Sequence, residues 1–204
     1  MTLPTRIDEG FILNEDYAVK LRLTGITVSD DASNARPVNV WYGQPDRELR
    51  EQNFPFMTID LVDIQEGKDR AHRGIVAVDP DALADPTNTN PVQFTDFPIP
   101  VNLVYQIQSW SRHPRHDRQI LRAMFNEVLP FKYGLLYVPG DGTQRSMWLT
   151  GYQKADRTDS NKKRLYRSLF TVVVVSELPM EKYTAVKKVT HVNAPVNKMA
   201  PTYP

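Results

Sequence analysis

The stretch 101–130 changes its hydrophobic period near its middle, and this change constrains the fold more than any other feature of the chain. In its first part the apolar residues Leu103, Tyr105 and Ile107 alternate with polar ones, which is typical of a strand with one buried face. After Pro114, which suits the first position of a helix, apolar residues recur at helical spacing. The stretch therefore predicts a strand leading into an amphipathic helix that packs back on a sheet.

Shorter patterns predict the elements around this unit. Residues 14–23 fit both an alternating strand and a helix with acidic residues in its first turn, and we favour a short helix ending at Gly25. The polar cluster 29–36 is interpreted as a turn or loop. Strands are predicted at 38–42, at 54–64, in a hairpin formed by 134–138 and 147–152, and at 165–176, which is apolar on both faces in its second half and should lie inside the sheet.

Two segments differ from this regular pattern. Residues 65–100 contain five prolines and few clustered apolar residues, and they predict an extended arm or flap with one short strand at 75–78. Residues 180–204 are basic and contain prolines, which favours an extended tail that orders, if at all, on a partner.

Together these patterns predict the α+β class. A chain of 204 residues with 41% hydrophobic residues can bury one substantial core. We expect a single domain at 1–179, with a mixed, mostly antiparallel β-sheet flanked by one or two α-helices and a long flap at 65–100, followed by the extended tail at 180–204.

Composition narrows the possible functions. The formal charge is only +1, so the whole-protein field gives no reason to expect nonspecific binding to nucleic acid or anionic membranes. The absence of cysteine excludes disulfides, thiol catalysis and thiolate metal sites. The longest apolar run is too short to span a bilayer and the first residues lack a signal-peptide pattern, so we expect a soluble protein without a visible export signal.

The segment RHPRHDR at 112–118 is the densest group of titratable residues. His113, His116 and Asp117 could ligate a metal, but a fourth ligand would have to come from elsewhere. We favour a solvated helix N-terminus in which Asp117 complements the helix dipole. Asp60 and Asp63 of one strand should point to opposite faces and so cannot form an acid–base pair. No catalytic residue, metal site or cofactor is predicted.

Four arginines of the predicted helix region, Arg112, Arg115, Arg118 and Arg122, form a basic patch. The patch could meet phosphate or the carboxylates of a partner, or it could be an ordinary solvated helix face; no nucleic-acid motif accompanies it. The remaining candidate subunit-interface residues are Trp110, Trp148, Lys182, Lys187 and Lys188.

The order of these elements resembles the tail terminator and neck (head-to-tail joining) proteins of tailed bacteriophages. The resemblance lies in PVNVWYGQPDRELREQNFPFMTIDLVDI at 37–64 and in VNLVYQIQSWSRHPRHDRQILRAMFNEVL at 101–129. It covers most of residues 14–176, but the flap at 65–100 and the tail after residue 179 are longer than a minimal terminator needs.

The resemblance implies a non-enzymatic virion protein that forms a ring, usually sixfold, at the head-proximal end of the tail. Such a ring stops tube growth and joins the tail to the neck or connector. The implied partners are further copies of the chain, the tail tube, the sheath if the tail is contractile, and the connector, with nonspecific proximity to genomic DNA and no membrane. Other neck, tail-completion or baseplate proteins, a metal-dependent enzyme and a nucleic-acid-binding module are the alternatives.

Overall fold

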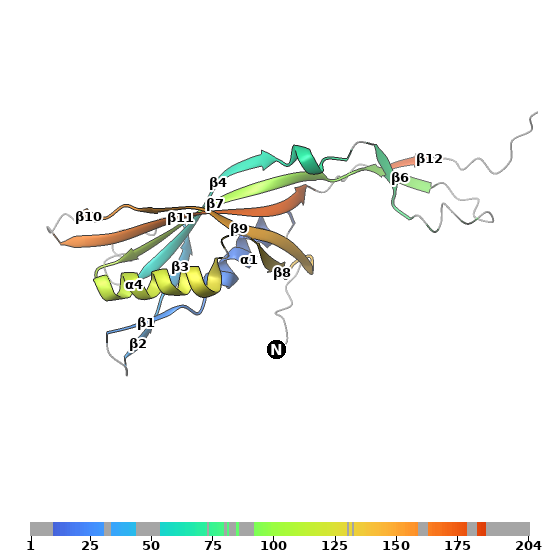
Figure 1. The fold of residues 1–204 in the computed structure, drawn as a ribbon. Coiled ribbons are helices and arrows are strands. Elements are labelled where there is room, and N and C mark those ends of the chain that lie inside the picture. Colours follow the sequence, from blue (N-terminus) through green and yellow to red (C-terminus); the bar gives the residue numbers. More distant parts are fainter. Residues whose placement is uncertain are drawn as a thin grey trace, which may run out of the picture. The chain divides into compact units, whose positions relative to one another are not determined.

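The structure is a computed structural model that describes residues 10–30, 34–43, 54–72, 74–79, 81, 85, 92–129, 131, 133–158, 163–178 and 183–186. The chain divides into two compact units. The main unit combines Met1–Ala71 with Ile99–Leu178, and the second unit combines His72–Pro98 with Pro179–Pro204. The helices and the large sheet of the main unit are labelled in Figure 1.

The main unit is built on a seven-stranded sheet. Its strands are β3 (Asn39–Tyr42), β4 (Phe56–Glu66), β7 (Ile99–Ser111), β8 (Gly134–Val138), β9 (Thr143–Lys154), β10 (Arg157–Thr158) and β11 (Arg164–Leu178). They follow the order β3-β4-β7-β11-β9-β8, with β10 paired to β11, and every pair is antiparallel except β3 with β4. The predicted α+β class and the mixed, mostly antiparallel sheet are confirmed, as is the interior position of β11.

The strand and helix predicted at 101–130 are confirmed as β7 and α4 (Pro114–Ala123), with Pro114 at the helix start. The helix continues into η2 (Met124–Val128), one π-helical turn. Ile120 of α4 and Ile107 of β7 are both fully buried in the same core cluster, so α4 lies on the face of the sheet that carries Ile107. We call this the covered face and the opposite one the outer face.

The short helix favoured near the N-terminus is confirmed as α1 (Leu13–Leu23). Its first turn is fixed to the covered face by two carboxylates. Glu15 accepts a hydrogen bond from the hydroxyl of Ser176 on β11, and Asp16 accepts one of 2.7 Å from the hydroxyl of Tyr105 on β7. These bonds satisfy polar groups that would be costly to bury alone.

The loop predicted at 29–36 is wrong in part, because the structure forms a two-stranded hairpin of β1 (Thr27–Ser29) and β2 (Ala35–Pro37). The side-chain amide of Gln119 on α4 completes the edge of β1: it accepts a hydrogen bond of 2.8 Å from the Ser29 N–H and donates one of 3.1 Å to the Ser29 carbonyl. Strands of three residues are too short to show alternation, so sequence alone could not reveal them.

The predicted hairpin is confirmed as β8 and β9, and the turn between them is shaped by its glycines. Gly142 has a φ of 69°, a conformation that favours glycine. Gly140 is needed for a different reason, because a Cβ there would lie 2.1 Å from the Asn14 side-chain oxygen of α1. The turn therefore also sets how closely α1 approaches the sheet.

A β-bulge in β4 overturns the expectation that Asp60 and Asp63 point to opposite faces. Pairing with β7 shifts register between Leu61 and Asp63. As a result Asp60 lies opposite Gln106 and Asp63 lies opposite Val104, two positions on the same face of β7. An inserted residue reverses the alternation, and nothing in the local sequence marks where the insertion falls.

The second unit contains a three-stranded antiparallel sheet in the order β12-β6-β5. Its strands are β5 (Ile75–Ala77), β6 (Val92–Asp96) and β12 (Tyr183–Val186). The short strand predicted in the flap is confirmed as β5. Part of the predicted tail pairs with the predicted flap, which the sequence did not indicate because the two strands are far apart in the chain. The division into 1–179 and 180–204 stays a prediction.

Candidate protein-interaction surface

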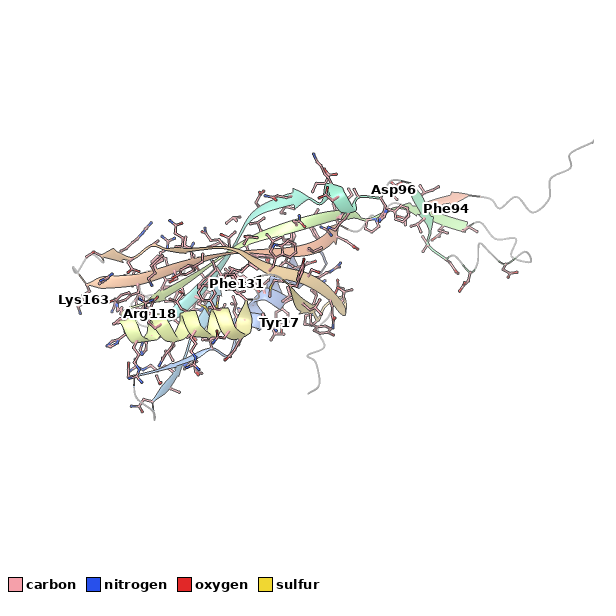
Figure 2. The ribbon with its side chains drawn as sticks, in the orientation of Figure 1. Tyr17, Phe94, Asp96, Arg118, Phe131 and Lys163 are labelled. Atoms are coloured by element: carbon pink, nitrogen blue, oxygen red, sulfur yellow. The ribbon has the colours of Figure 1, made fainter. Side chains whose placement is uncertain are left out.

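Three arginines project from the exposed side of α4. Arg115, Arg118 and Arg122 are all exposed and lie opposite the buried residues Ile120 and Met124 on the helix. Within the described part of the chain, no carboxylate forms an ion pair with any of them. We call these three residues the arginine face; Figure 2 labels Arg118 on α4.

The other predicted member of the basic patch, Arg112, precedes the helix and lies elsewhere. Its guanidinium is 4.5 Å from the ring centroid of Phe54. Trp110 is only 6% exposed and packs within the chain, 6.1 Å from Phe56 by ring centroids and 4.7 Å beneath the guanidinium of Arg167. Both side chains thus contribute to the packing of the main unit, and a role for them between subunits stays a prediction.

The outer face of the sheet carries a stripe of half-buried apolar side chains. Strand pairing aligns Val104 of β7, Val173 of β11 and Trp148 of β9 in one row across the sheet. All three are intermediate in exposure, whereas their covered-face neighbours on β7 and β11 are fully buried. We call this row the outer stripe. Trp148, a predicted interface residue, lies in it.

Two carboxylates flank the outer stripe on β4. Asp63 lies directly beside Val104 in the row, and Asp60 is on the same face opposite Gln106. Asp63 accepts hydrogen bonds from the Ile64 N–H at 2.9 Å and from the Gln65 amide at 2.8 Å. Of the cations in the described segments, none is within ion-pair distance of either carboxylate. The outer face therefore carries uncompensated negative charge next to apolar surface.

The interpretation of 112–118 as a solvated helix N-terminus is wrong for two of its residues. His116 is 6% exposed and Asp117 is 3% exposed. His116 Nε2 lies 2.7 Å from Asp30 Oδ1 without hydrogen-bond alignment, while His113 remains exposed. Among the described residues no group of three potential ligands could hold a metal ion.

Lys154 is the residue that accounts for the burial of Asp117. Its ammonium lies 2.5 Å from Asp117 Oδ1 and 3.2 Å from the Ser168 hydroxyl, and 3.4 Å from Asp156. Lys154 is the last residue of β9. No local pattern could have paired it with Asp117, because 37 residues separate the two.

Several buried polar atoms gather at one end of the outer face. Thr58 is fully buried and its hydroxyl lacks a hydrogen-bond partner, as do Trp110 Nε1 and Arg167 Nε among the described residues. Another nitrogen of Arg167 donates a 2.8 Å hydrogen bond to Gln108. Burial lowers the pKa of Arg167 from its usual range, and the charge of Arg157 adds to this. Sequence reasoning did not find this cluster.

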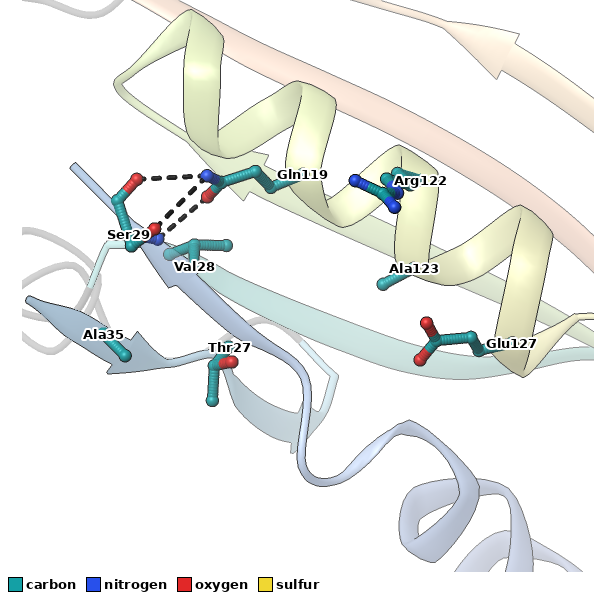
Figure 3. A pocket seen from close by; sticks show the side chains of 8 residues that line it. All are labelled: Thr27, Val28, Ser29, Ala35, Gln119, Arg122, Ala123 and Glu127. Carbon is teal, nitrogen blue, oxygen red and sulfur yellow. Dashed lines mark hydrogen bonds between the residues drawn. The ribbon is translucent and has the colours of Figure 1, made fainter. Parts of the chain in front are cut away.

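A polar hollow lies between β1 and α4, shown in Figure 3. Its volume is about 310 Å³, and it is open to solvent beside the bonded pair Gln119 and Ser29. Figure 3 shows the other lining residues, Thr27, Val28, Ala35, Arg122, Ala123 and Glu127. A second hollow of about 440 Å³ shares Thr27, Ala123 and Glu127 with the first. Among the described residues, no hydrogen bond joins the Thr27 or Ser29 hydroxyl to the Glu127 carboxylate, so the lining shows no activated nucleophile and we assign no reaction to it.

Two further expectations from the sequence concern the lysines of the tail and membrane-spanning segments. Lys182, Lys187 and Lys188 lie outside the described residues. No helix in the described ranges has both the length and the apolar character needed to cross a membrane.

The comparisons with known proteins include a likeness to a solved structure. No family model matches the chain, and no curated protein matches it. A solved structure of the sheath/tube terminator of an extracellular contractile injection system, PVC, in the extended state aligns with 98% of this chain and 67% of its own. The two are 14% identical and the TM-score is 0.49. A likeness of that size fixes neither a partner nor an activity for this chain.

Proposed function

We propose that this chain is a structural protein of a phage-like particle that forms a hexameric ring at the head-proximal end of a tail. The ring would stop growth of the tail tube and join it to the neck or connector. Its partners would be further copies of the chain, the tube, the sheath where the tail is contractile, and the connector, with genomic DNA passing nearby.

One observation carries this proposal: among the described residues, helices cover only one face of the main sheet, and the opposite face is partly apolar and charged. On the covered face Leu103, Tyr105 and Phe170 are fully buried. On the outer face Val104, Val173 and Trp148 remain half exposed. Apolar surface of this kind, next to charges that form no ion pair with any described residue, is a feature of surfaces that bind other proteins.

The charged surfaces also favour assembly over catalysis. The arginine face consists of exposed side chains, and the hollow that its member Arg122 helps to line is open to solvent rather than enclosed. Its three members, together with Trp148, are the residues that we propose at the subunit interface. Lys182, Lys187, Lys188, Arg112 and Trp110 remain predicted interface residues.

Light scattering after size exclusion, combined with negative-stain imaging, tests the proposal. We expect the purified protein to form closed rings of uniform copy number. Alternatively, it is a monomer that forms a ring after addition of tail tubes, which are assembled beforehand from the tube protein of the same particle. Added before polymerisation is complete, the protein should shorten the tubes and label one end only. A monomer that neither closes into rings nor binds tube ends would contradict the proposed function.

A further inference from the structure

Two sets of charged residues that form no ion pair within the described part of the chain lie on opposite sides of the main unit. Arg118 and Arg122 project from the side of α4 that faces away from the sheet. Asp60 and Asp63 lie on the outer face, which α4 does not cover. Because the sheet and the helix separate the two sets, they cannot meet within one chain.

The spacing of the two sets matches. Arg118 and Arg122 are one helical turn apart, which places their Cβ atoms about 5–6 Å from each other. Asp60 and Asp63 lie opposite Gln106 and Val104, positions two residues apart on β7, which corresponds to about 7 Å along the strand. Two guanidinium groups on a helix can therefore reach two carboxylates on this strand together.

The surroundings of the carboxylates suit an arginine-bearing helix. Asp63 heads the row that continues through Val104, Val173 and Trp148. Arginine carries a long aliphatic stem that can cover apolar surface while its charged end reaches a carboxylate. Both oxygens of Asp63 already accept one hydrogen bond, yet each retains a further lone pair for a guanidinium.

We infer that the arginine face of α4 in one copy binds Asp60, Asp63 and the outer stripe of the next copy. This inference rests on the proposed ring, and it names the two surfaces that join its subunits. A contact between two different surfaces of identical chains is head-to-tail, and such a contact closes into a ring when its rotation permits. Charge complementarity favours a second copy of the chain as the occupant of the outer face, since each copy carries the basic surface on α4 and the acidic surface on β4.

Charge reversal tests the pairing. We expect R118E/R122E and D60R/D63R each to weaken ring formation at least about 100-fold, because like charges would face each other at every contact. When the two variants are mixed, every contact regains opposite charges, so rings in which the variants alternate should form. The chain carrying all four substitutions should also form rings. D63R alone, at an exposed position, replaces D60R/D63R if that pair impairs folding as judged by circular dichroism.

Neutral variants give a second readout. R118Q/R122Q mixed with D60N/D63N leaves one complementary contact per pair of chains, so light scattering should show a dimer that does not grow. K68E/K163E is the matched control, since it reverses two exposed basic residues outside α4 and outside the strands of the large sheet, and it should leave the ring intact. If R118E/R122E forms rings as wild type does, or if mixing the two charge-reversed variants does not restore rings, the pairing alone is overturned. A wild-type chain that never assembles overturns the pairing and the proposed function together.

Discussion

The two faces of the main sheet differ in burial, although the same alternating strands supply the side chains of both. On β11, Phe170, Val172 and Val174 of the covered face are fully buried, whereas Val173 and Val175 between them are only half buried. The helices α1 and α4 account for the difference, because both pack on the covered face. In one strand, therefore, every second residue stabilises the fold, and the residues between them remain available for contacts with other proteins.

The carboxylates of the two faces differ in the same way. Glu15 and Asp117 are buried against the covered face, and each accepts hydrogen bonds from that sheet. Asp60 and Asp63 on the outer face form no ion pair with the cations that the structure describes. A buried carboxylate requires a hydrogen-bond or ion-pair partner within the chain, whereas a solvated carboxylate needs none and can bind a cation of another protein.

Truncation of one aromatic residue on the covered face should have the largest effect on stability. Phe170→Ala should lower the free energy of unfolding by about 3–5 kcal/mol, because it removes a fully buried ring and leaves a cavity. Val173→Ala, three positions along the same strand, should cost no more than about 1 kcal/mol. Urea denaturation measures both values. Equal losses for the two variants would mean that the outer face is as buried as the covered one.

Removal of the Asp117 carboxylate should have the next largest effect. Asp117→Ala should cost about 2–3 kcal/mol, because it leaves the half-buried Lys154 ammonium with only the more distant Asp156 as a charged partner. Adding Lys154→Met should recover part of this loss, since the half-buried ammonium is then removed as well. A double-mutant cycle with a coupling energy near zero would show that the two residues do not stabilise each other.

The elements that the sequence predicted are those whose signals are local. Pro114 and the change of period identified β7 and α4, and a local hairpin pattern identified β8 and β9. The structure also depends on partners that are distant in the chain: Gln119 holds the β1–β2 hairpin, and Lys154 accounts for the buried Asp117. The arginine face was predicted from helical spacing, but its proposed counterpart on β4 was hidden by the bulge, which reverses the face of Asp63.

The bond between Asp16 and Tyr105 should give a smaller, pH-dependent effect. Burial raises the pKa of Asp16 above its ordinary value of 3.8, although the Tyr105 hydroxyl acts in the opposite direction. Protonated Asp16 is therefore favoured in the folded state, and this contribution to stability is lost as the pH rises through the raised pKa. Asp16→Asn keeps a hydrogen-bond acceptor but cannot ionise.

The stability of Asp16→Asn relative to wild type should accordingly increase from below pH 3.8 towards neutrality, as measured by thermal unfolding across that range. Tyr105→Phe serves as the control for the hydrogen bond, with an expected cost of about 1 kcal/mol. A difference between wild type and Asp16→Asn that does not change with pH would contradict the raised pKa.

A polar substitution on the outer stripe should have the smallest effect on folding. Val104→Thr keeps the shape and the strand propensity of a half-exposed residue, so the free energy of unfolding should change by no more than about 0.5 kcal/mol. It should nevertheless weaken assembly, which sedimentation at several protein concentrations would detect. Leu103→Thr on the covered face is the comparison and should lower stability sharply.

Hydroxyl-radical footprinting of Trp148, below and above the concentration at which wild-type chains assemble, tests most directly whether the outer face is the surface for assembly. We expect the oxidation of Trp148 to fall on assembly in wild type and to stay unchanged at the same concentrations in R118E/R122E. Oxidation of Trp148 that is the same in assembled and unassembled wild-type protein would contradict the account.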